Sequence, residues 1–336
     1  MKIKLLLNIL IISCVSVYSN TLATTSFDHI ILTIERAMQA HIYDSAVLST
    51  PAYRDMKTKV RQLATESTTE AAFIAGFNQL WSQGPFSHVR LIKSDKSANQ
   101  MAEFVDTMEV GGTGAQLRFE QNTAILTVST MMGRDTINQI NAAYQILAEK
   151  KPAALIIDLR GNPGGAFAVK PLVSHLLKDG LDAGIFLSQK WTSQHHQLPT
   201  TQTIVAVEPW QGWSLPSFWR DVQENPITRV RFEPQQPIYQ GKIYVLISKT
   251  TASAAELAAD AMRTSGRVVL IGERTAGTLL SQKPYDLGHG LQLFLPIAEY
   301  ISSSLGRIEA NGVQPDISVP AEQALTRALR AVSEGL

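Results

Sequence analysis

Three segments that lie far apart in the sequence carry residue types suited to acyl-transfer chemistry. The first is I-D-L-R-G-N-P-G-G at residues 157–165, where an apolar run leads into a glycine-rich turn. Glycine lets the backbone approach a ligand closely, and successive N–H groups in such a turn can stabilise an anion. The turn lacks the Gly-Lys-Ser/Thr ending of a phosphate-binding loop and the G-x-G-x-x-G spacing of a dinucleotide site. The interpretation of this turn as part of an oxyanion hole is therefore not excluded.

The second segment is T-T-A-S-A-A-E at residues 250–256, which joins a predicted strand to a predicted helix. Ser253 can be the N-cap of that helix with Glu256 completing a capping box, and this structural role accounts for an isolated S-x-x-E pattern. A serine at this junction is also well placed as a nucleophile. The helix N-terminus favours developing negative charge, and the next backbone N–H can donate to an oxyanion.

The third segment is I-E-A-N-G-V-Q-P-D-I at residues 308–317, a turn-rich stretch that contains Glu309. A single glutamate on a surface turn is normally solvated. Glu309 therefore gains significance only in combination with the other two segments.

Length, composition and charge limit the class of protein. The chain has 336 residues, of which 45% are hydrophobic and 18% charged, so it is long enough for about two globular domains or one larger α/β unit. Its 30 basic and 29 acidic residues nearly cancel, which argues against a nucleic-acid partner or a charge-driven membrane partner. A single cysteine excludes a disulfide scaffold within the chain and a multi-cysteine metal cluster.

The N-terminal residues 1–23 have the pattern of an export signal: a basic start, an apolar run and a small-residue cleavage site ending at Ala23. The apolar run is too short for an integral membrane span. I-I-S-C, ending at Cys14, resembles a bacterial lipoprotein cleavage box, and acylation there would anchor the protein. Because apolar residues continue past Cys14, we favour a soluble protein exported to the periplasm or secreted, with the anchored form as the alternative.

Helical periodicity predicts a small helical N-terminal domain at residues 24–84, with a capping box at 67–70. Beyond residue 111, nearly continuous apolar runs alternate with helical patterns, which is typical of an α/β sheet covered on both faces. We place this core at 85–320 and a C-terminal helix at 321–336. The predicted strands of the core are 123–128, 153–159, 243–247 and 268–271, and the predicted helices are 136–148, 167–177 and 254–262.

Residues 190–240 interrupt this alternation as a long irregular insertion that holds four of the five tryptophans. Long insertions in compact domains are usually functional or disordered, and so many large aromatic residues favour order. Two interpretations are equally supported: a small satellite core, or an aromatic wall or lid over a substrate groove.

Taken together, four motifs resemble the C-terminal processing, or tail-specific, serine peptidase family over about two thirds of the chain. They are D-L-R-G-N-P-G-G at 158–165, T-A-S-A-A-E at 251–256, G-E-R-T-A-G at 272–277 and G-V-Q-P-D at 312–316. The resemblance implies a crotonase-like α/β core with a helical N-terminal part. It also implies that Ser253 is the nucleophile and that the N–H groups of Gly165 and Ala254 form the oxyanion hole.

The chain departs from the better known branch of that family, which places a catalytic lysine directly after the G-E-x-T-x-G turn. Thr278 occupies that position here, and Lys283 could substitute only after rearrangement of the loop. The stretch between His88 and the strand at residue 123 is also too short for a PDZ domain. A Ser/Lys dyad and tail recognition through a PDZ groove are therefore not expected.

F-S-H-V at residues 86–89 resembles instead the Ser-His step of the tricorn-type branch. The resemblance implies that His88 is the general base, Glu309 its orienting carboxylate and Ser87 an auxiliary polar group. The chemistry is coherent, because a serine hydroxyl needs a base and the resulting imidazolium needs a fixed carboxylate. His289, which follows the G-E-x-T turn, is the second candidate for the base.

The prediction is an exported serine peptidase that hydrolyses a peptide or protein substrate through an acyl-enzyme, with no metal or organic cofactor. One alternative is a catalytically inactive binding protein on the same scaffold, although a binder needs no serine, histidine and glutamate in register. The other is a crotonase-like acyl-transfer enzyme acting on acyl-CoA, which fits poorly with an export signal because its cofactor is intracellular.

Overall fold

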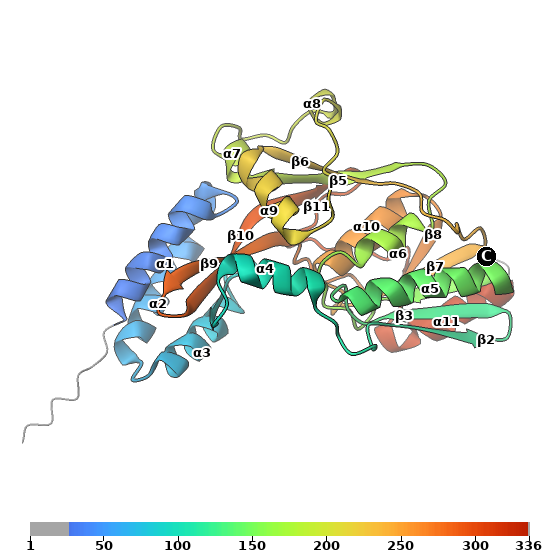
Figure 1. Cartoon of the computed structure of the whole chain (residues 1–336), viewed down its shortest axis with the longest axis horizontal. Helices are drawn as coiled ribbons and strands as arrows, with labels where there is room; N and C mark the ends of the chain where they lie inside the picture. Colours follow the sequence, from blue (N-terminus) through green and yellow to red (C-terminus); the bar gives the residue numbers. More distant parts are fainter. Residues whose placement is uncertain (1–26, 335–336) are drawn as a thin grey trace, which may run out of the picture.

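The computed structural model describes residues 27–334 (Figure 1). The predicted export signal at 1–23, including Cys14, lies outside the described residues. None of the helices in the described range is long and apolar enough to cross a membrane.

Three helices form one end of the molecule. They are α1 (Asp28–His41), α2 (Pro51–Glu66) and α3 (Glu70–Trp81), with a 3-10 turn at Ser45–Ser49 before α2. The capping box predicted at 67–70 is wrong, because Ser67 ends α2 by donating its hydroxyl to the Leu63 carbonyl. Thr69 caps α3 instead, by accepting the N–H of Ala72.

The apolar faces of these helices do not close on themselves but share a core with strands of a sheet. Phe73 and Phe77 are fully buried there, together with Leu91 of β1 (Arg90–Lys93) and Leu293 of β10 (Leu291–Ser302). Figure 1 shows the helices beside the hairpin of β9 and β10. The helical part is therefore held in place by the strands that follow it, including strands from the C-terminal third of the chain.

One of the two sheets is mainly parallel, with the strand order β12-β8-β7-β4-β3-β2. Only the β2–β3 pair is antiparallel. Its strands are β2 (Ala115–Glu120), β3 (Thr123–Val128), β4 (Ala154–Asp158), β7 (Lys242–Ile247), β8 (Val268–Gly272) and β12 (Ile317–Ser318). The nearly continuous apolar runs of the central strands are buried on both faces, as predicted for a covered parallel sheet.

Helices cover both faces of this sheet. The first face packs against α5 (Arg134–Lys150), α6 (Val169–Ser174) and α10 (Ala254–Thr264). The second packs against α11 (Ala324–Glu334), which follows a 3-10 turn at Ala321–Gln323. Because β4 and β7 are adjacent and parallel, the turns after them open at the same edge of the sheet. This topology brings the glycine turn beside Ser253.

A second sheet, absent from the sequence-based prediction, is antiparallel throughout. Its order is β1-β10-β5-β6, and both β9 and β11 also pair with β10. The strands not yet defined are β5 (Leu181–Ser188), β6 (Ile227–Phe232), β9 (Leu280–Gly288) and β11 (Gly306–Arg307). The sequence of β10 lacks the uninterrupted apolar run typical of a buried strand. Pro296 lies at its centre, and Gln292 and Glu299 are buried polar residues within it. Pro296 is tolerated at a register shift in the pairing with β9.

Residues 190–240 are more regular than predicted. Besides β6 they contain α8 (Thr201–Val205) and α9 (Leu215–Glu224), and α7 (Gln189–Thr192) overlaps their start. Trp210, Phe218 and Trp219 are buried in the main core. Between β1 and β2 the chain forms the single helix α4 (Ala98–Thr107), which packs against α9.

Candidate active site

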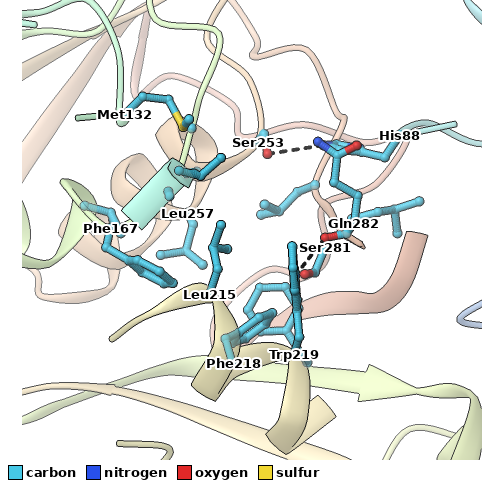
Figure 2. Close-up of a pocket in the computed structure, with 18 of the residues that line it drawn as sticks. His88, Met132, Phe167, Leu215, Phe218, Trp219, Ser253, Leu257, Ser281 and Gln282 are labelled. Atoms are coloured by element: carbon cyan, nitrogen blue, oxygen red, sulfur yellow. Dashed lines mark hydrogen bonds between the residues drawn. The ribbon is translucent and has the colours of Figure 1, made fainter. Parts of the chain in front are cut away.

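Ser253 lies at the start of α10, in the turn after β7, and has an unusual backbone conformation. Its φ of 53° and ψ of −122° are strained for a residue with a side chain, and such strain persists only where the surroundings hold it. The hydroxyl of Ser253 is 3.3 Å from Nε2 of His88, across the mouth of a cavity (Figure 2). The structure thus brings together two residues that are 165 positions apart.

His88 precedes β1, is half-buried and also has a positive φ, of 64°. Its Nδ1 lies 2.6 Å from the hydroxyl of Ser87. Desolvation lowers the pKa of the imidazole to about 4. His88 is therefore neutral at ordinary pH, which is the form that can accept a proton.

Glu309 reaches His88 through Ser87. One carboxylate oxygen accepts the backbone N–H of Ser87 at 3.1 Å, and the other accepts the N–H of Leu279 at 2.7 Å. The Ser87 hydroxyl also favours the charged form of Glu309. Burial raises the pKa of the Glu309 carboxyl, and the hydrogen bonds from Ser87 and Leu279 oppose that shift.

The Ser87 hydroxyl can pair with Nδ1 in either tautomer of His88, as donor or as acceptor. In the tautomer with its proton on Nδ1, that N–H donates to the Ser87 oxygen, and the unprotonated Nε2 faces Ser253. The four side chains form a chain in the order Ser253, His88, Ser87 and Glu309.

The glycine turn lies directly behind Ser253. A Cβ on Gly164 would come within 2.8 Å of the Ser253 Cβ, so this contact requires glycine. Asn162, fully buried, fixes the turn: its side chain accepts the Gly164 N–H at 2.9 Å, and its carbonyl accepts the Ala252 N–H at 3.1 Å. The two turns after β4 and β7 are therefore bonded to each other.

Gly165 and Ala254 both line the cavity beside Ser253. Gly165 bridges Met131, and the bonds of that bridge use the groups on either side, the carbonyl of Gly164 and the N–H of Ala166. Gly165 itself has a φ of 145°, a conformation that favours glycine. The Ala254 N–H belongs to the first turn of α10, where helix amides have no partner within the helix.

Glu256 does more than the capping role predicted from the sequence. This fully buried carboxylate accepts the Ser253 N–H at 3.0 Å and the Thr275 hydroxyl at 2.5 Å. It also accepts the N–H groups of Gly277 and Thr278, at 2.7 and 2.9 Å. The same turn carries Leu279, whose N–H holds Glu309. Glu256 therefore connects the strained serine to the loop that positions Glu309, a role that S-x-x-E by itself did not reveal.

The two other candidates for the base lie elsewhere. Lys283 donates to the Gln223 side chain at 2.8 Å and lies over the rings of Trp219 and Tyr285. His289 is at the tip of the β9–β10 hairpin, edge-on to His29. Neither lines the cavity at Ser253. Among the residues described, no group of three or more histidine, cysteine or acidic side chains is arranged to hold a metal ion.

A cavity of about 280 Å³ opens at Ser253 and His88. Its walls are largely aromatic and aliphatic, and Figure 2 shows Phe167, Leu257 and Leu215 lining it on the side away from His88. Several of these side chains come from residues 190–240. Trp210 and Trp219 thus belong to the main core rather than to a small satellite core, and they also line the cavity.

Residues 122–319 match the model of peptidase family S41, and the chain belongs to this family. The match includes Gly165, Ser253, Ala254 and Glu309. Ser87 and His88 precede it, so their place beside Ser253 is a finding of the three-dimensional structure.

Relatives of known name agree with the family. The chain is 27% identical over 188 residues to the carboxyl-terminal-processing peptidase 3, chloroplastic, of Arabidopsis thaliana, covering 56% of this chain and 30% of that protein. It is 30% identical over 167 residues to a carboxyl-terminal-processing protease of Picosynechococcus sp., covering 50% and 32%. The chain thus spans about a third of the length of these relatives.

The fold is also found among solved structures. The photosystem II D1 C-terminal processing protease superposes with a TM-score of 0.54 and 15% identity, covering 91% of this chain and 97% of that one. The predicted α/β fold with a crotonase-like core is confirmed.

Proposed function

We propose that this protein is a serine peptidase of the C-terminal processing type, which hydrolyses peptide bonds through an acyl-enzyme on Ser253. The observation that carries the proposal is the chain of contacts from Ser253 to His88 at 3.3 Å, to Ser87 at 2.6 Å and on to Glu309. A mere binding site needs no neutral imidazole facing a strained serine.

In the first step, the Ser253 oxygen attacks the peptide carbonyl carbon while His88 Nε2 takes the hydroxyl proton. The imidazolium keeps its Nδ1–H on the Ser87 oxygen, and the negative charge of Glu309, which accepts the Ser87 backbone N–H, stabilises it. The carbonyl oxygen becomes an oxyanion, which the N–H groups of Gly165 and Ala254 stabilise together with the positive end of α10.

In the second step, the tetrahedral intermediate expels the amine, which receives the proton from His88 Nε2. The acyl group remains on Ser253 as an ester. A water molecule then attacks the ester while His88 again takes a proton, and the returning proton releases Ser253 and a free carboxylate. Every proton transfer uses the same His88 nitrogen, so no further acid or base is required.

The proposal includes export. Residues 1–23 supply the signal, and the mature protein acts outside the cytoplasm. N-terminal sequencing of protein secreted from a bacterial host tests this, with a chain that starts at residue 24 as the cytoplasmic control. Recovery of the uncut chain in the cytoplasm would contradict export without affecting the chemistry.

The test of the catalytic proposal is covalent labelling with a fluorophosphonate. The protein starting at residue 24 should be labelled, and mass spectrometry should find the adduct on Ser253. Ser253→Ala should lose the label, whereas Ser248→Ala, which removes a serine hydroxyl bonded to the Arg160 carbonyl, should keep it. Labelling of another residue would disprove the assignment.

One observation also favours a binding protein on this scaffold, namely the large apolar cavity. The two functions differ in outcome. A binding protein would take up an apolar ligand with Ser253 unlabelled and with no cleavage of a peptide library, whereas a peptidase yields both the adduct and new carboxyl termini.

A further inference from the structure

The cavity of about 280 Å³ begins at the groups proposed to hold the reacting carbonyl. Gly165, Ala254 and Ser253 line it. Leu257, Leu215 and Trp219 line it as well (Figure 2). A side chain attached next to a carbonyl carbon at Ser253 would therefore enter it directly.

The direction of the cavity identifies which side of the peptide bond it serves. His88 must protonate the leaving amine, so the leaving part of the substrate lies on the side of His88. In Figure 2, Leu257, Leu215 and Phe167 lie on the far side of Ser253 from His88, whereas Ser281 and Gln282 line the cavity on the His88 side. The part of the cavity formed by Leu257, Leu215 and Phe167 is therefore placed for the side chain of the residue that contributes the carbonyl, the P1 residue.

The walls discriminate against charge. Among the described residues that line the cavity, Arg90 alone has a formally charged side chain, and its guanidinium lies over the ring of Phe294, 4.9 Å from the ring centre. None of these described lining residues is a carboxylate that could pair with a basic side chain. A charged P1 side chain would lose its hydration among aromatic rings without gaining a partner inside.

The volume discriminates by size. A cavity of about 280 Å³ has room for a large side chain, and for several water molecules when no side chain occupies it. An alanine side chain would leave most of these waters against apolar walls, whereas an aromatic or long aliphatic side chain would displace them.

We propose that the cavity selects a large apolar P1 residue, aromatic or long aliphatic, and that residues 190–240 set this preference. Trp213, Leu215, Phe218 and Trp219 all come from that segment and form one wall. The inference rests on the proposed peptidase function, since P1 has no meaning without cleavage at Ser253.

The test compares kcat/KM for synthetic peptides that differ only at P1, with phenylalanine, leucine, alanine, aspartate or lysine. Since one methylene in an apolar pocket changes kcat/KM by roughly 10- to 200-fold, phenylalanine and leucine should exceed alanine by about 100-fold or more. Aspartate and lysine should be cleaved more slowly than alanine. Equal rates, or a preference for alanine or a charged residue, would overturn the inference.

Fluorophosphonate labelling distinguishes failure of the P1 preference from failure of the proposed peptidase function. A protein that labels at Ser253 but shows no preference at P1 retains the proposed function and loses this inference. A protein that neither labels nor cleaves loses the proposed function itself.

A substitution within the cavity sharpens the test. Leu215→Trp should fill the wall opposite Ser253 and lower the phenylalanine-to-alanine ratio of kcat/KM by about tenfold or more. Leu198→Trp is the matched control, because Leu198 is exposed, belongs to the same segment and does not line the cavity. A folded Leu215→Trp protein with the original ratio would contradict the assignment. If it fails to fold, the P1 series on the unsubstituted protein decides.

Discussion

The two halves of the candidate site are held in different ways. Ser253, Gly165 and Ala254 lie in turns at the ends of two adjacent parallel strands, and short backbone bonds through Asn162 join those turns. His88 and Glu309 come from segments more than 200 residues apart and meet only through Ser87 and the loop at Leu279. The serine half is held by the pairing of β4 with β7, whereas the histidine half is held by the buried neighbours Phe86 and Val89 and by long-range hydrogen bonds to Glu309.

This difference predicts how each half fails. Substitution of a reacting group should abolish turnover in either half. Substitution of a residue that only positions the reacting groups should lower kcat by a smaller amount, and this amount should increase with the number of hydrogen bonds that the residue makes.

The largest effect is expected from removing the base. His88→Ala should lower kcat by about 10⁴- to 10⁶-fold, and the double variant with Ser253→Ala should be no slower than Ser253→Ala alone. The reason is that the Ser253 hydroxyl and the His88 imidazole act together in the attack on the carbonyl carbon. Single-turnover kinetics on a chromogenic ester measures this, with circular dichroism as the control for folding. Additive losses in the double variant would show that His88 does not act on Ser253.

An intermediate effect is expected from Glu256, the connection between the halves. Glu256→Gln leaves an amide N–H₂ facing groups that donate, so kcat should fall by about 10²-fold and stability by about 3 kcal/mol. The fluorophosphonate labelling rate should fall with kcat, while KM stays within a few-fold.

The matched control for this substitution is Glu322→Gln, an exposed glutamate near the start of α11. Urea unfolding gives the stability of both variants. A loss of stability in Glu256→Gln with an unchanged labelling rate would mean that Glu256 supports the fold alone and does not position Ser253.

The smallest effect is a shift in the pH profile. Because desolvation lowers the pKa of His88 to about 4, kcat/KM should fall as pH decreases through about 4 rather than through 6.5. The unfolded chain binds a proton at His88 below about pH 6.5 whereas the folded protein does not, so stability should also decrease as pH falls from about 6.5 to about 4.

Two measurements check this shift. A pH series of kcat/KM gives the acid limb, and urea unfolding at pH 7 and pH 5 in His88→Gln should show a smaller loss of stability than in the unsubstituted protein. An acid limb near 6.5 would contradict a desolvated imidazole beside Ser253.

Much of the parallel sheet could be predicted from local pattern. The runs predicted at 123–128, 243–247 and 268–271 agree with β3, β7 and β8 to within one residue, because strands buried on both faces have an uninterrupted apolar signal. The helix predicted at 167–177 is shorter in the structure, as α6 covers only Val169–Ser174.

The antiparallel sheet could not be predicted in the same way. In β10 the residues Gln292, Pro296 and Glu299 interrupt the apolar pattern, and the strand exists because β1, β5 and β9 pair with it. Each of these partner strands is distant along the chain or lies in a segment whose sequence has only a weak strand pattern. Residues 190–240 were expected to be irregular for the same reason, although they contribute β6 and α9.

By itself the sequence determined the residue types and the local turns: a serine at the start of a helix, glycines where a Cβ would collide, and strands that are apolar on both faces. These features depend on neighbours within a few residues. Only the tertiary structure decided that His88 meets Ser253, that Ser87 lies between His88 and Glu309, and that aromatic residues 210–219 form a cavity beside them. Such meetings depend on the pairing of distant strands and on the packing of helices between two sheets, and no local pattern encodes them.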